Sequence, residues 1–171
     1  MGLLSRSKIF DPIRKIWVAA TPEEKVRQGV VQYMLEHLGY PKELLSIEKD
    51  LKTLPHLGAL EKNFPPRRID IICFAKDICP GYALYPLLMI ECKQKKLDVN
   101  SIEQILGYNY YIKAFFIAVA NDCEIRLGYL EKETNQYRFT SHLPSFHELL
   151  EQVTPSARIR EPSDGAGSSH F

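Results

Sequence analysis

Residues 87–93, LLMIECK, place an acid and a lysine at the end of a continuous apolar run, and residues 69–74, IDIICF, place a second acid within another such run. Apolar, β-favouring runs without polar alternation are typical of strands buried on both faces of a sheet. A carboxylate in such a strand is costly unless it is paired or binds a cation. The two stretches therefore predict central strands with a functional acid in each, Asp70 and Glu91.

Helical patterns flank these strands. Thr21 and Pro22, followed by two glutamates, predict a helix start, because Thr caps, Pro suits the first turn and acids match the helix dipole. Apolar residues then recur every four positions until Gly39, where the helix should stop. A second helix is expected over about 100–113 and a short closing helix over 144–153.

Further β-favouring segments complete the predicted sheet. Strands are expected over 44–51, 115–120, 125–130 and 136–143. Residues 75–86, which contain Pro80-Gly81, are expected to form a turn or hairpin connection. Mixed strands with helices covering them predict an α/β sandwich, with a central mixed β-sheet flanked by helices.

The bulk properties suit one domain in a chain of 171 residues. Residues 1–20 are interpreted as a lead-in with a short strand or packing point at Trp17-Val18, residues 21–153 as the folded domain, and the Pro/Ser/Gly-rich residues 154–171 as a disordered tail. The formal charge is +1, so phosphate binding must come from a local basic cluster. No zinc pattern, signal peptide or membrane span is evident, which predicts a cytoplasmic protein with free thiols.

The two acids and the lysine suggest a metal-dependent catalytic site. On a strand, Glu91 and Lys93 point to the same face, about 6.6 Å apart. Asp70 and Glu91 could share Mg²⁺, with the backbone carbonyl of Cys92 as a further ligand and Mn²⁺ as a substitute metal. Lys93 would then lie beside a metal-activated water that attacks a phosphodiester. From the spacing alone, an ion pair holding strand edges together is an equal alternative.

The chain resembles the N-terminal nuclease domain of type I restriction enzyme R subunits, a branch of the PD-(D/E)xK nucleases, over about residues 21–121. Four elements carry the resemblance, in this order: TPEEKVRQ (21–28), PPRRIDIICF (65–74), LLMIECKQ (87–94) and QILGYN (104–109). The resemblance implies a restriction-endonuclease-like fold and a Mg²⁺-dependent DNA nuclease, as an endonuclease in the first instance. This chain contains no G-x-x-x-x-G-K-[ST] phosphate loop, so a motor would have to come from helicase, translocase or specificity subunits encoded separately.

The resemblance also implies roles for individual residues. Asp70, Glu91 and Lys93 match the core motif, and Glu24 matches an acid that these nucleases add to the metal site. Gln104 and Tyr108 match a Q-x-x-x-Y element on the following helix, where they face one groove. As alternatives, Glu24 could serve only the helix dipole, and Gln104 and Tyr108 could be an ordinary polar residue and a packed aromatic.

Basic residues surround the motif. Arg67 and Arg68 precede Asp70, and Lys95 and Lys96 follow Lys93. For the two arginines, contact with DNA phosphates and simple solvation are equally open.

Two function classes remain in competition at this level. The first is a metal-dependent nuclease acting on DNA, and a nuclease of the same fold directed at tRNA or other RNA is a further possibility. The second is a catalytically silent module of the same fold that binds nucleic acid or protein. The intact Asp70, Glu91 and Lys93 favour the enzyme, whereas the near-neutral charge favours the binder or an enzyme that depends on partners. The oligomeric state stays open, with a homodimer as one option.

Overall fold

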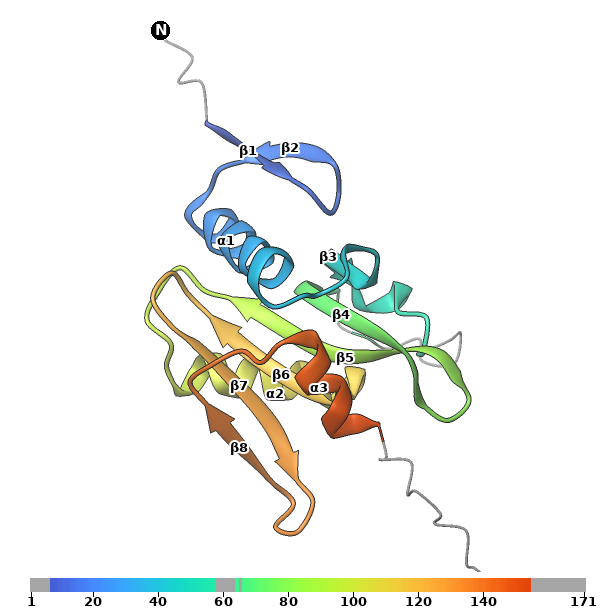
Figure 1. Ribbon diagram of the computed structural model, residues 1–171. Helices are drawn as coiled ribbons and strands as arrows, with labels where there is room; N and C mark the ends of the chain where they lie inside the picture. The colour runs from blue at the N-terminus through green and yellow to red at the C-terminus, as the bar shows by residue number, and fades with distance from the viewer. Residues whose placement is uncertain (1–6, 58–63, 65, 155–171) are drawn as a thin grey trace, which may run out of the picture.

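A six-stranded mixed sheet forms the centre of the computed structural model, which describes residues 7–57, 64 and 66–154 (Figure 1). The sheet order is β3-β4-β5-β6-β7-β8, and a separate two-stranded sheet pairs β1 with β2. The elements are β1 Lys8–Asp11, β2 Ile16–Ala19, α1 Pro22–His37, the 3₁₀ turn Lys42–Leu44, β3 Leu45–Asp50, the 3₁₀ turn Leu51–Thr53, β4 Arg68–Cys79, β5 Tyr82–Cys92, α2 Val99–Ile112, β6 Phe116–Ala120, β7 Ile125–Glu131, β8 Gln136–Thr140 and α3 Phe146–Val153. The predicted α/β class, with a mixed sheet and flanking helices, is confirmed and is consistent with a restriction-endonuclease-like fold.

β4 and β5 are the long central strands, and they pair antiparallel. The expectation of a turn or hairpin connection over 75–86 is wrong in extent, because β4 continues to Cys79 and β5 begins at Tyr82. Pro80 and Gly81 reverse the chain between them, and Gly81 adopts φ +86°, which a residue without Cβ tolerates. β5 pairs parallel with β6, and α2 provides the crossover that a parallel connection requires.

Each face of the sheet has its own apolar core. On one face, Val26, Val31 and Met34 of α1 pack with Ile90 and Leu149. The core on the other face contains residues of α2, β4, β5 and β6, among them Ile105, Ile112, Ile72, Met89 and Ile117. In Figure 1, α1 and α3 lie on the near side of the sheet and α2 on the far side. Burial on both faces explains why the central strands lack polar alternation.

Three boundaries differ from the sequence predictions. The lead-in contains a complete hairpin, because β1 and β2 pair in full from Lys8↔Ala19 to Asp11↔Ile16. The last strand ends at Thr140 rather than 143. The closing helix begins at Phe146 rather than 144, because Ser145 takes the capping position and forms a capping box with Glu148.

The polar side of α1 faces inward near its N-terminus. Glu24, Arg27 and Gln28 are buried although they lie in the first two turns of the helix. Thr21 caps this end as expected, its hydroxyl accepting from the Glu24 N–H. The helix ends at His37, and Gly39 follows with φ +66°. α1 therefore presents an apolar side to the sheet and a buried polar group to the strand ends.

Two further sequence predictions concern the C-terminal tail and membrane-spanning helices. Apart from Thr154, the predicted tail lies outside the described residues. Within the part of the chain that the structure describes, no helix is both long enough and apolar enough to cross a membrane.

Candidate active site

Asp70 and Glu91 come together at one end of the central strand pair. The register Ile71↔Ile90, extended by one residue, places them opposite each other, and each is only 7% exposed. The Cys92 N–H donates to Asp70 Oδ2 at 2.8 Å. Burial raises the pKa of Glu91 to about 7, and the charge of Asp70 adds to that rise while Lys93 opposes it. The two carboxyl groups therefore form an electrostatically coupled pair.

Lys93 and the second helix complete one side of this pair. The Lys93 N–H donates to the Ala120 carbonyl at 2.8 Å, which fixes the residue directly after β5. Its Nζ donates to Glu91 Oε1 at 3.1 Å and to Gln104 Oε1 at 2.7 Å. Gln104 Nε2 in turn donates to Glu91 Oε1 at 3.1 Å and to the Tyr108 hydroxyl at 2.8 Å. One hydrogen-bonded chain thus joins Glu91, Lys93, Gln104 and Tyr108.

Arg27 of α1 lies on the other side of the pair, a residue that the sequence interpretation did not select. Its side chain is 5% exposed, and its guanidinium donates to Asp70 Oδ1 and to Glu24 Oε2. Glu24 also accepts from Gln28 at 2.9 Å. Glu24 is therefore joined to Asp70 through an arginine. The signal was present in the sequence, since Arg27 lies three residues after Glu24 on the same helix face.

An interruption in the pairing of β3 with β4 brings a further acid to this group. Glu48 stands opposite Asp70 in the unshifted register of β3 with β4, at a point where the pairing is interrupted, and it has φ +48°, an uncommon conformation for a residue with a Cβ. Its carboxylate lies 3.2 Å from Arg27 and 3.2 Å from Arg14, which also pairs with Glu24. Such strained residues concentrate at functional sites, where surrounding contacts compensate for them. Sequence reasoning missed both Glu48 and Arg14.

The predicted nucleic-acid-binding residues lie around the site. Arg67, Gln104 and Tyr108 line an open groove of about 480 Å³ beside α2. Lys95 and Lys96 are exposed in the connection after β5. Arg68 is also exposed, 3.8 Å from Glu48.

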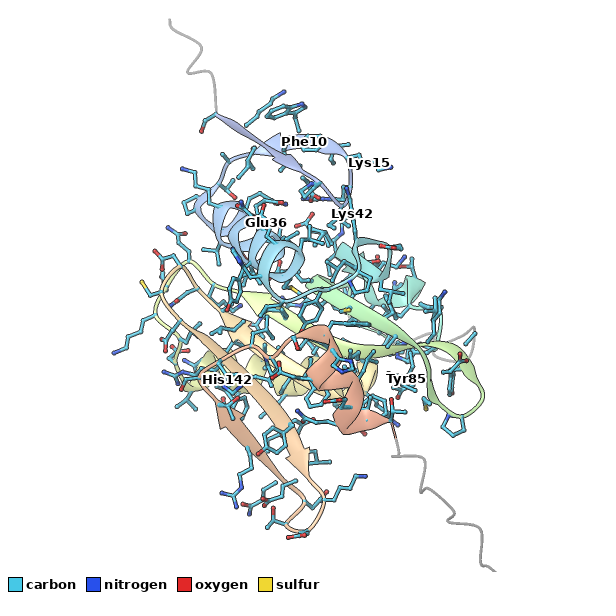
Figure 2. The ribbon with its side chains drawn as sticks, in the orientation of Figure 1. Phe10, Lys15, Glu36, Lys42, Tyr85 and His142 are labelled. Carbon is cyan, nitrogen blue, oxygen red and sulfur yellow. The ribbon has the colours of Figure 1, made fainter. Side chains whose placement is uncertain are left out.

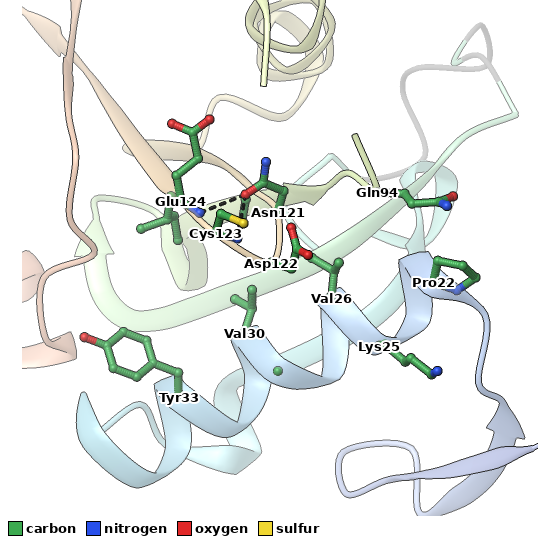
Figure 3. A pocket seen from close by; sticks show the side chains of 13 residues that line it. Pro22, Lys25, Val26, Val30, Tyr33, Gln94, Asn121, Asp122, Cys123 and Glu124 are labelled. Carbon is green, nitrogen blue, oxygen red and sulfur yellow. Dashed lines mark hydrogen bonds between the residues drawn. The ribbon is translucent and has the colours of Figure 1, made fainter. Parts of the chain in front are cut away.

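A larger cavity lies elsewhere. It has a volume of about 660 Å³ and lies between α1 and the β6–β7 turn (Figure 3). Pro22, Lys25, Tyr33, Gln94 and Asp122 are among its lining residues, which do not include Asp70, Glu91 or Lys93. The carboxylate pair therefore does not line this larger cavity.

The donor set fits one kind of metal site. Within the described residues, no group of three or more His, Cys, Asp and Glu side chains is arranged to hold a metal ion. Asp70 and Glu91 instead provide two neighbouring carboxylates, and burial together with the charge of Asp70 raises the pKa of Glu91. Mg²⁺ is commonly bound through one or two carboxylates while it keeps several of its waters. The residues thus fit Mg²⁺ held in that way rather than in an all-protein cage.

Comparisons with known proteins agree with this arrangement at the level of the family. No significant match is found among curated proteins or among solved structures. Residues 22–144 match the family described as type I restriction enzyme R protein N terminus, a span from the start of α1 to just before α3. This span includes both carboxylates, Lys93 and α2, and it covers well over half of the chain. The chain therefore belongs to the family of type I restriction enzyme R protein N-terminal domains.

Proposed function

We propose that this chain is a Mg²⁺-dependent nuclease that hydrolyses phosphodiester bonds in DNA, with Mn²⁺ as a substitute metal. The observation that carries the proposal is the convergence of Asp70, Glu91 and Lys93 at one end of β4 and β5, with 3.1 Å between Lys93 Nζ and Glu91 Oε1. Membership in a restriction-subunit family supports DNA as the substrate, and it supports other restriction subunits as partners.

The chain's own residues have distinct parts in this proposal. Asp70, Glu91 and the Cys92 carbonyl would hold the metal, which when bound supplies Lewis acidity and a more acidic water. The Lys93 ammonium is held by Glu91 and Gln104, so its charge is oriented before substrate arrives. Arg27 holds Asp70 in place and offsets its charge. Glu24 acts through Arg27 rather than alone.

The groove beside α2 suits a DNA strand. Arg67 and Tyr108 lie in its lining, and Gly107 leaves open space above the helix, since nothing lies within 4 Å of an added Cβ there. An arginine can contact phosphate, and a tyrosine can contact sugar or base. Tyr108 accepts from Gln104, which accepts from Lys93, so the groove leads directly to the proposed catalytic lysine.

A second candidate is a silent module that binds DNA through the same surface. It is favoured by the engagement of both Asp70 carboxylate oxygens, one by Arg27 and the other by the Cys92 N–H. In this candidate, Arg27 serves permanently as the counter-cation that a metal would otherwise provide.

A plasmid-nicking assay separates the two candidates. Supercoiled DNA incubated with the full chain and Mg²⁺ or Mn²⁺ should be nicked, with no nicking in EDTA. Lys93→Ala should abolish nicking, while Lys76→Ala, a change at an exposed lysine far along β4, should leave it intact. DNA binding by the wild-type chain without any nicking would contradict the nuclease and favour the silent module.

A further inference from the structure

The N-terminal hairpin carries an aromatic surface that the fold does not bury. β1 and β2 form their own two-stranded sheet beyond α1, apart from the central sheet (Figure 1). Phe10 and Trp17 are directly opposite in register, with ring centroids 5.4 Å apart. This cross-strand pair stabilises the hairpin. Even so, Phe10 remains 45% exposed and Trp17 65% exposed.

The exposed charges of the hairpin are positive. Lys8 lies two residues from Phe10 on the same strand face, and Lys15 is exposed in the turn between β1 and β2; Figure 2 labels Phe10 and Lys15 on the hairpin. The acid of the hairpin, Asp11, is fully buried and is bonded by Arg14 and by the Ile13 N–H. The surface made of Lys8, Phe10, Lys15 and Trp17, here termed the hairpin face, is therefore aromatic and basic.

The hairpin is fixed beside the candidate active site. Arg14, in its turn, pairs with Glu24 at 3.1 Å and with Glu48 at 3.2 Å. These two acids also pair with Arg27, which holds Asp70. Glu24 and Glu48, each shared by Arg14 and Arg27, thus connect the hairpin to Asp70 of the carboxylate pair.

We propose that the hairpin face binds unpaired nucleotides of a DNA strand, with a base stacked on Trp17 and Lys8 and Lys15 near phosphates. The chemistry matches because every base has a π-face, so aromatic platforms flanked by cations bind single strands with little sequence preference. The exposed charges on the hairpin itself are two lysines, and Lys25 lies with Glu36 beside Phe10, so the positive charges of the hairpin fit a polyanion better than an apolar protein surface. The inference rests on the proposed function for its substrate class, and it adds a second contact site to it.

Tryptophan emission tests the proposal without any cleavage. Trp17 is the single tryptophan of the chain, so the fluorescence reports on the hairpin alone. The full chain is titrated in EDTA with a labelled oligothymidylate, and emission and label anisotropy are followed together. The expected result is saturable quenching with the same midpoint as the anisotropy change. Anisotropy showing DNA binding while Trp17 emission stays constant would overturn the proposal.

Variants distinguish stacking from a general loss of structure. Trp17→Ala should weaken binding of the single strand roughly tenfold or more. Trp17→Phe keeps an aromatic ring beside Phe10. It should bind the single strand within about threefold of the wild type, because a base can still stack on the phenylalanine ring. The matched control is Tyr110→Ala, a change at a 76% exposed aromatic on α2, which should bind like the wild type. Unchanged affinity in Trp17→Ala would refute stacking.

Two further results separate this proposal from the nuclease. Removing both charges in a Lys8→Gln/Lys15→Gln variant should reduce the slope of log affinity against log salt by roughly 1.4, at about 0.7 per phosphate contact. Quenching by single strands without plasmid nicking would leave the hairpin proposal standing and refute the nuclease. Nicking without quenching would do the reverse. Equal quenching by a blunt duplex and by a single strand would contradict binding of unpaired bases.

Discussion

Removing the Arg27 guanidinium should cost more stability than removing any exposed charge of the domain. Arg27→Met keeps much of the side chain's apolar length but leaves Glu24 and Asp70, whose side chains are 9% and 10% exposed, without their shared cation. Breaking a buried ion pair by deleting one partner costs about 3–5 kcal/mol, because the remaining charge stays buried. Glu24 keeps Arg14 and Gln28 as donors and Asp70 keeps the Cys92 N–H, so the expected loss lies near the lower end of this range, at about 3 kcal/mol.

Urea denaturation at pH 7 in EDTA measures this loss directly. A domain of this size should also lose about 2–4 °C of Tm per kcal/mol. Arg126→Met provides the matched control, because Arg126 is 39% exposed in a pair with Glu124, and such pairs contribute at most about 1 kcal/mol. The double variant Arg27→Met/Asp70→Asn should recover at least about 1 kcal/mol, since one orphaned charge is then gone. A loss below about 1 kcal/mol in Arg27→Met, or no recovery in the double variant, would refute the reasoning.

The remaining predictions concern one titration and two glycines. The folded-state pKa of Glu91 is raised from 4.5 to about 7, so the folded chain binds more protons than the unfolded chain between these values. Metal-free stability should therefore fall as pH rises from about 4.5 to 7, by on the order of 3 kcal/mol, and equilibrium denaturation should find this slope removed in Glu91→Gln. Gly128→Ala should cost about 1–3 kcal/mol, because the new Cβ would lie 2.5 Å from the Phe139 ring and 3.0 Å from Ile117. Gly29→Ala should instead gain about 0.5–1 kcal/mol, since nothing lies within 4 Å of its Cβ position in α1; equal Tm values for the two glycine variants would contradict this account.

The central strands were predictable because nearly all of their residues are apolar. LLMIEC and IDIICF have almost no polar positions, which requires burial on both faces, and the structure provides helices on both. The same burial makes their acids conspicuous, so Asp70 and Glu91 could be selected before their positions were known. Their register opposite one another supports the pairing, while their catalytic roles stay a prediction.

Other parts were not predictable from local pattern. The extension of β4 and β5 to Pro80-Gly81 depends on pairing between residues such as Lys76 and Leu84, which cross-strand contacts decide rather than propensity. The N-terminal hairpin is held by Arg14, whose partners lie as far away as Glu48. Because such ion pairs join distant segments, a single sequence carries no periodic signal for them.

The inward polar side of α1 was only partly visible. Glu24 was selected through a motif, but its partner Arg27 was missed, although a buried acid requires a cation or donors close by. A buried acid needs a cation or hydrogen-bond donors nearby, and the residues one helical turn from Glu24 include Arg27. A search of those positions would therefore have selected Arg27 from the sequence. Glu48, which pairs with the same arginines, gives no such signal, because its φ of +48° at an interruption of the β3–β4 pairing depends on the fold and not on the local sequence.

Calorimetric titration of the full chain with Mn²⁺ in the absence of DNA tests the central claim most directly. If Asp70 and Glu91 share a divalent ion, the wild-type chain should bind about one equivalent, and both Asp70→Asn and Glu91→Gln should lose that binding while remaining folded by circular dichroism. Glu124→Gln, a change at a carboxylate in an exposed turn pair, should bind like the wild type. Absence of binding in the wild type, or equal binding in all four proteins, would contradict the assignment of a metal site to these two acids.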